Sequence, residues 1–168
     1  TWVENVYRLF TDRNFAIIDK DGKKIGYARS VWAMISMNTR KPADLLALHG
    51  GSIVDYVCDE SCPIEKPSRI KVTATEPSTI LEAKYSDIDI NGHVNSIRYI
   101  EHILDLFPIE FYKKSRIRRF EMAYVAESYY GDVLTFYKDD VGNGVYEIEV
   151  KKNAGEVVCR SKVIFTEK

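Results

Sequence analysis

The stretch Tyr85–Pro108, YSDIDINGHVNSIRYIEHILDLFP, decides how this chain is interpreted. Polar side chains occupy every second position of its first part, namely Asp87, Asp89, Asn91, His93 and Asn95. Apolar residues then recur at every third or fourth position, which predicts an amphipathic helix over 95–107. Asn91 or Asn95 is suited to cap this helix, and Pro108 to end it. Polar chemistry is therefore expected at a helix N-terminus, where backbone N–H groups and the helix dipole favour a developing negative charge.

Length and composition describe an ordinary globular chain. Its 168 residues suggest one domain or two small ones, and 45% apolar content is sufficient for a core. The net charge of −1 argues against a nucleic-acid-binding surface spread over the whole protein. No apolar run is long enough to span a bilayer.

The three cysteines are expected to be free thiols, as in a cytosolic-type compartment. Cys58 and Cys62 are close in sequence, but no second Cys or His pair completes a zinc site with them. The sequence therefore predicts neither a metal site nor a disulfide framework.

The second half of the chain predicts a complete α+β unit. A strand over 79–84 enters the polar cluster, and the helix follows it. Four more strands are expected to form an antiparallel meander, over 116–128, 132–138, 145–151 and 156–166. These elements together predict a curved sheet wrapped around one helix.

The first half predicts three strands within residues 2–37, with a hairpin at Asp19–Gly22. A short helix is expected over 43–49, closed by Gly50-Gly51. The segment 51–77 has three prolines and several charges, and is interpreted as a connector.

A faint internal repeat relates the two halves, because Phe15-Ala-Ile and Ala28-Arg-Ser are echoed by Tyr146-Glu-Ile and Cys159-Arg-Ser. We therefore expect three divisions, which are the last strands of a first copy over 1–50, the connector over 51–77 and a complete second copy over 78–168. The chain begins already in a strand pattern, so the rest of the first copy and any transit peptide are expected upstream of Thr1.

Several motifs carry a family resemblance. The most specific is Asp-Ile-Asp-Ile-Asn-Gly-His-Val-Asn over 87–95, and it is supported by Ala-Arg-Ser-Val-Trp over 28–32, Asn-Thr-Arg-Lys-Pro over 38–42 and Tyr-x-x-Glu over 124–127. With these motifs the chain resembles the acyl-ACP thioesterases, double-hotdog enzymes of plants and bacteria. The resemblance implies an α+β hotdog fold, in which an antiparallel sheet wraps around a long helix, with one complete hotdog preceded by the C-terminal strands of another.

The same resemblance implies an activity and its partners. The reaction is hydrolysis of the thioester that joins a fatty acyl chain to the phosphopantetheine arm of acyl carrier protein. The resemblance implies no cofactor beyond the phosphopantetheine that the substrate carries. It also implies no nucleic-acid partner and no membrane span. The expected location is cytoplasmic, as in bacterial members, and a plastid location is not excluded. A homodimer is possible as well.

Four catalytic positions are carried over from the family, Asp89, Asn91, His93 and Glu127. Glu127 is the preferred general base, while Asp89 either orients His93 or shares that role. Asn91 is expected to hold the water or the carbonyl. His93 either donates to the thioester or orients Asn91.

The setting expected for Glu127 follows from strand parity. An extended strand through residue 128 places Glu127 on one face with Glu121, Ala123 and Val125. That apolar setting would raise the pKa of the Glu127 carboxyl towards the working range of a base.

One departure from the family concerns the residue after Glu127. Plant members have a cysteine there, once proposed as a nucleophile, whereas this chain has Ser128. A covalent Cys–His–Asn mechanism is therefore unsupported, and an activated water is expected instead. Asn95, Tyr99 and Ser128 are the expected substrate-binding residues.

A basic run over 112–119 contains five cations. A solvated strand entrance is one explanation. Docking of the acidic carrier protein at Lys113, Lys114 and Arg116 is the other.

Two rival functions remain open. One is another hotdog acyl-thioester enzyme, either an acyl-CoA thioesterase or a dehydratase, although the Glu127 motif argues against the dehydratase. The other is a non-catalytic acyl-binding module.

Overall fold

The computed structural model describes residues 1–153 and 155–168. The chain divides into two compact units, Thr1–Pro67 and Ser68–Lys168. Within the described residues, no helix has both the length and the apolar character needed to cross a bilayer.

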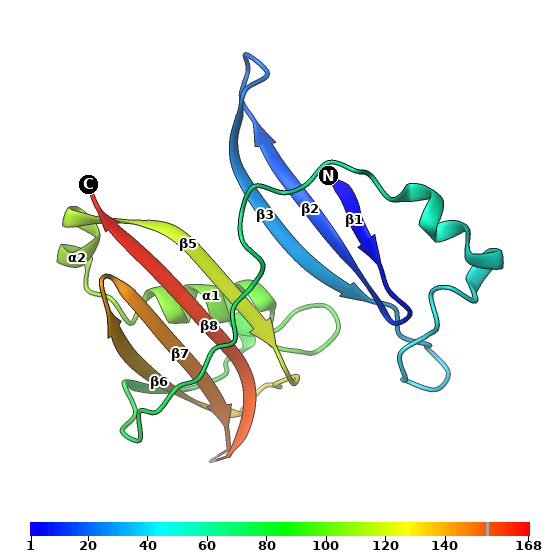
Figure 1. Ribbon diagram of the computed structural model, residues 1–168. Coiled ribbons are helices and arrows are strands. Elements are labelled where there is room, and N and C mark those ends of the chain that lie inside the picture. The colour runs from blue at the N-terminus through cyan, green and yellow to red at the C-terminus, as the bar shows by residue number, and fades with distance from the viewer. Residues whose placement is uncertain (154) are drawn as a thin grey trace. The chain divides into compact units, whose positions relative to one another are not determined.

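The first unit contains a three-stranded antiparallel sheet, in the order β1-β2-β3 (Figure 1). Its strands are β1 (Trp2–Val6), β2 (Phe10–Ile18) and β3 (Lys24–Ala33). The three predicted strands are confirmed, although β3 ends at Ala33 rather than extending to Met37. The predicted hairpin is also confirmed, because Asp19 Oδ1 accepts the backbone N–H groups of Asp21 at 3.0 Å and Lys23 at 2.8 Å.

The short helix predicted over 43–49 is wrong in position. A 3-10 helix, η1 (Leu48–Tyr56), occurs instead, and the two glycines expected to close a helix lie inside it. His49, Gly50 and Gly51 have φ values of 46°, 67° and 83°, so the segment consists of two helical turns joined at a left-handed kink.

The residues after η1 contact the first sheet. Val57 forms a parallel bridge with Val3. Arg29 of β3 donates to the backbone oxygens of Cys62 at 3.1 Å and Ile64 at 2.9 Å. This part of the predicted connector therefore belongs to the first unit.

The second unit contains a five-stranded antiparallel sheet, in the order β4-β6-β7-β8-β5. Its strands are β4 (Thr79–Glu82), β5 (Ser115–Tyr124), β6 (Val133–Gly142), β7 (Val145–Lys152) and β8 (Glu156–Glu167). The predicted four-strand meander is wrong in one respect, because β5 pairs with β8 and not with β6. The segment that joins β5 to β6 therefore passes from one side of the sheet to the other.

The helix that follows the polar cluster is α1 (Ser96–Leu104). Of the two predicted caps, Asn91 and Asn95, it is Asn95 that caps the helix, and its side-chain oxygen accepts the N–H of Ile97 at 3.0 Å. The helix ends three residues earlier than predicted. Pro108 does not end α1 but caps a second, unpredicted helix, α2 (Ile109–Lys114), since its φ of −67° suits the residue before a helix.

The core of the second unit lies between α1 and the sheet. Tyr99 and Ile103 are the buried residues of α1. Their partners on β6, β7 and β8 are fully buried and include Leu134, Phe136, Ile148, Val150 and Val163. This packing fixes the start of α1, and with it the polar loop that precedes the helix.

Candidate active site

The loop between β4 and α1 carries three of the predicted catalytic residues. Asp89 organises it, because Asp89 Oδ1 accepts the backbone N–H groups of Asn91 at 2.8 Å and His93 at 3.2 Å. The Asp89 N–H in turn donates to the backbone oxygen of His93 at 2.8 Å. Gly92 closes this turn with a φ of 82°, a left-handed conformation that favours glycine.

These contacts also set the ionisation of Asp89. Partial loss of solvent alone would raise the pKa of this carboxyl, but the hydrogen bonds from the Asn91 and His93 backbones and the Asn91 side chain outweigh that effect. With the nearby charge of His93, they hold the pKa of Asp89 below its ordinary value. Asp89 is therefore a stabilised carboxylate at neutral pH.

Glu127 meets His93 at the start of α1. The segment that follows β5 is held to the loop by the Val94 N–H, which donates to the Ser128 backbone oxygen at 2.8 Å. Glu127 Oε2 lies 3.5 Å from His93 Nε2 and accepts the Tyr129 hydroxyl at 3.1 Å. The ring of Tyr129 lies edge-on to the imidazole, with 5.2 Å between ring centroids.

The apolar setting predicted for Glu127 is wrong. β5 ends at Tyr124, so strand parity does not extend to Glu127, and its side chain is 49% exposed. The strand face that carries Glu121 is polar as well, since Arg119 Nε lies 2.6 Å from Glu121 Oε1. Glu127 is therefore a solvent-accessible carboxylate held between a histidine and a tyrosine.

The predicted substrate-binding residues occupy three different settings. The side chain of Asn95 is engaged in capping α1. Tyr99 and Ser128 are buried, and among the described residues neither hydroxyl has a hydrogen-bond partner. Burial raises the pKa of Tyr99 to about 12.

The thiols differ in burial and position. Cys159 is buried in β8, and burial raises its pKa to about 12, so its thiol stays protonated at neutral pH. Cys58 is exposed and Cys62 is buried, and both belong to the first unit. In the described part of the chain, no group of three or more His, Cys, Asp or Glu side chains is arranged to hold a metal ion.

The cations of the basic run lie on α2 and β5. Lys113, Lys114 and Arg116 are exposed, and Lys113 pairs with Glu110 at 2.6 Å. Arg119 is less exposed, because it turns towards Glu121.

Three residues near the loop were not assigned a role from the sequence. Tyr129 contacts both His93 and Glu127. Asp87 is buried and faces His102 of α1, with 3.3 Å between Oδ1 and Nε2. Asp87 belongs to the alternating polar pattern, whereas nothing in the sequence pairs it with His102.

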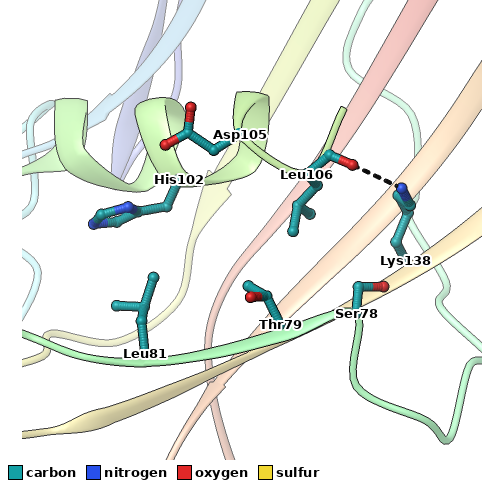
Figure 2. A pocket seen from close by; sticks show the side chains of 7 residues that line it. All are labelled: Ser78, Thr79, Leu81, His102, Asp105, Leu106 and Lys138. Carbon is teal, nitrogen blue, oxygen red and sulfur yellow. Dashed lines mark hydrogen bonds between the residues drawn. The ribbon is translucent and has the colours of Figure 1, made fainter. Parts of the chain in front are cut away.

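A cavity of about 380 Å³ lies at the His102 end of this arrangement, not at His93 (Figure 2). Its lining comes from β4, α1, β6 and residues directly flanking β4 and α1, and consists of Ser78, Thr79, Leu81, His102, Asp105, Leu106 and Lys138. Lys138 Nζ donates to the Leu106 oxygen at 3.0 Å, and burial lowers the pKa of this lysine.

Comparisons with known proteins identify the family of the chain. The model of the acyl-ACP thioesterase C-terminal domain matches residues 70–167, and that of the N-terminal domain matches residues 1–47. The chain belongs to the acyl-ACP thioesterase family. The α+β hotdog fold expected from the sequence motifs is confirmed.

A solved structure supports the same assignment. An acyl-ACP thioesterase from Bacteroides thetaiotaomicron VPI-5482 is 78% identical, with a TM-score of 0.91, over 98% of this chain and 66% of that one. The 12:0-ACP thioesterase from Umbellularia californica is 21% identical, with a TM-score of 0.80 over 99% of this chain and 66% of that one, and shares the fold.

Curated relatives in the acyl-ACP thioesterase family are longer than this chain. A chloroplastic palmitoyl-acyl carrier protein thioesterase of Arabidopsis thaliana is 26% identical in an alignment of 167 positions, which covers 95% of this chain and 40% of the relative. The chain thus spans less than half the length of that relative and about two thirds of the two solved structures.

Proposed function

We propose that this protein hydrolyses the thioester of fatty acyl-acyl carrier protein and releases the free fatty acid. The observation that carries the proposal is the pairing of Glu127 with His93, at 3.5 Å, beside the N-terminus of α1. A carboxylate and an imidazole at this separation can take a proton from water and return one to a leaving thiolate. The family membership of the chain supports the thioester as the bond that is broken.

Glu127 is the general base in this proposal, and Asp89 positions the loop. Hydrogen bonds that hold the pKa of Asp89 low also make it a weak proton acceptor. The side chain of Glu127 is 49% exposed, so an incoming water can reach its carboxylate. Tyr129 donates to Glu127 Oε2 and holds the carboxylate beside His93.

The remaining groups act on the carbonyl. Asn91 lies on the turn that Asp89 organises, and in this proposal its side-chain amide holds either the water or the thioester oxygen. The positive end of the α1 dipole begins at Ser96 and favours negative charge that develops on that oxygen.

A direct attack by water is favoured over a covalent intermediate. A nucleophilic thiol would have to be ionised, and burial keeps Cys159 protonated. Ser128 is fully buried, and among the described residues its hydroxyl has no base as a hydrogen-bond partner. Its predicted role as a substrate contact, like those of Tyr99 and Asn95, stays a prediction.

Acyl carrier protein is the proposed partner, and the fatty acyl chain and its phosphopantetheine arm are the proposed ligands, with no further cofactor. Lys113, Lys114 and Arg116 are exposed and offer positive charge to an acidic carrier. A bacterial-type, cytoplasmic location is part of the proposal, and the 78% identity to a Bacteroides protein supports only its bacterial character.

The test is a release assay on acyl-ACP beside acyl-CoA with the same acyl chain. The proposal expects hydrolysis of both thioesters, with a higher kcat/KM for acyl-ACP, and loss of both activities in Glu127→Ala. Equal or better hydrolysis of acyl-CoA would make the protein a general acyl-CoA thioesterase. Tight acyl binding without turnover would leave an acyl-binding module.

A further inference from the structure

A second pair of a carboxylate and a histidine lies on the other side of the catalytic loop. His102 Nε2 is 3.3 Å from Asp87 Oδ1, with side-chain exposures of 22% and 9%. The mechanism above uses neither residue. A buried carboxylate is costly unless its oxygens are hydrogen-bonded, so this contact requires an explanation.

Asp87 holds both ends of the loop. Its Oδ2 accepts the backbone N–H of Lys84 at 2.7 Å, where the chain leaves β4. Its backbone oxygen accepts the N–H of Asn95 at 2.8 Å, where the chain enters α1. Asp89, Asn91 and His93 all lie between these two anchor points.

His102 is the group that holds Asp87 itself. It lies two turns along α1 from the Asn95 cap, and its ring packs edge-on against the fully buried Phe136 of β6, with 6.2 Å between ring centroids. The imidazole is therefore fixed by the core, and its Nε2 lies 3.3 Å from Asp87 Oδ1.

We infer that His102 is a positioning residue for the reaction, acting through Asp87. It fixes the Asp87 carboxylate, and Asp87 then fixes the entry and the exit of the loop that presents His93 to Glu127. The inference depends on the proposed function for its effect on turnover. The clamp itself is a property of the loop and can be measured without a substrate.

The kinetic test uses His102→Leu, which removes the donor, and His102→Gln, whose amide nitrogen can donate from near the position of Nε2. His102→Leu is expected to lower kcat on acyl-ACP roughly tenfold while KM changes by less than about twofold. The reason is that the change misplaces the reacting groups but leaves substrate binding intact. His102→Gln is expected to recover most of that loss. Glu101→Gln is the matched control, on the same turn of α1 but exposed and paired with Arg98, and it should match the wild type.

Backbone amide exchange supplies the second readout. The amides of Lys84 and Asn95 should exchange faster in His102→Leu than in the wild type, while the amide of the core residue Ile148 keeps its rate. A wild-type protein that hydrolyses no acyl thioester would refute the proposed function alone, and the exchange rates would still decide the clamp. Unchanged protection of Lys84 and Asn95 in His102→Leu would overturn the inference, as would a kcat loss that His102→Gln does not recover.

Discussion

Two pairs of a carboxylate and a histidine flank one loop, and they differ in exposure rather than in distance. Glu127 and His93 are 3.5 Å apart, with side-chain exposures of 49% and 29%. Asp87 and His102 are 3.3 Å apart, with exposures of 9% and 22%. The two pairs therefore have similar chemistry but very different access to water.

The difference assigns the pairs separate tasks. A carboxylate that is half exposed can accept a proton from an incoming water, which a general base must do. The Asp87 carboxylate has both oxygens engaged, one by the Lys84 N–H and the other by His102. We therefore propose that the exposed pair is the reactive one and that the buried pair holds the loop in place.

The largest expected effect breaks the exposed pair. Glu127→Ala should lower kcat on acyl-ACP by about 100-fold or more, the usual contribution of a general base. Steady-state release of fatty acid measures this loss, with the exposed α1 variant Glu101→Ala as the control. If Glu127→Ala kept more than about a third of wild-type turnover, the role assigned to the exposed pair would be wrong.

A smaller effect is expected at the docking surface, away from both pairs. Reversing Lys113, Lys114 and Arg116 to Glu should raise KM for acyl-ACP roughly tenfold at low salt, because the cations attract an acidic carrier. Hydrolysis of a short, uncharged thioester should change much less. Equal losses on both substrates would indicate damage to the site, and no loss on acyl-ACP would place the carrier elsewhere.

Asp89 lies between Asp87 and His93 in the loop, and its ionisation is expected to make the free energy of unfolding depend on pH. Its folded pKa is lowered, so the ionised form stabilises the fold above the unfolded pKa of about 3.9, and this contribution is lost as pH falls through the lowered folded value. Urea unfolding should therefore show Asp89→Asn less stable than the wild type at pH 7, with the difference shrinking below about pH 4. A difference that is constant from pH 7 to pH 3 would contradict the hydrogen bonding described for Asp89.

The smallest effect is expected at Cys159. Because burial keeps this thiol protonated, Cys159→Ala should retain kcat within about threefold of the wild type. Ser128→Ala should lose far less activity than Glu127→Ala. Accumulation of an acyl-enzyme in the wild type that Ser128→Ala abolishes, detected by intact mass after rapid quenching, would replace the activated water with a covalent route.

The sequence predicted those parts of the fold that depend on local patterns. Asn95 was recognisable as the cap of α1 because a short polar side chain directly precedes the apolar periodicity. The turn at Asp19–Gly22 was recognisable for the same local reason. The pairing of β5 with β8 was not predictable in this way, because it depends on contacts distant in sequence.

The site was predicted less completely than the fold. Sequence motifs brought His93 and Glu127 together as candidates, but strand parity gave the wrong setting for Glu127, since parity holds only while β5 continues. Asp87 and His102 are fifteen positions apart. Their contact depends on how the loop folds back onto α1, and this cannot be predicted from the spacing of residues in the sequence.

Rescue by an added carboxylate tests the central claim most directly. The kcat of Glu127→Ala and of Asp87→Ala would be measured with increasing sodium formate at constant ionic strength. The account predicts that formate raises the turnover of Glu127→Ala, because the exposed position admits a small base, and leaves Asp87→Ala unchanged, because the lost group is an anchor. The opposite pattern would contradict the assignment of the two pairs. In that pattern formate raises the turnover of Asp87→Ala, while Glu127→Ala turns over at the wild-type rate and does not respond to formate.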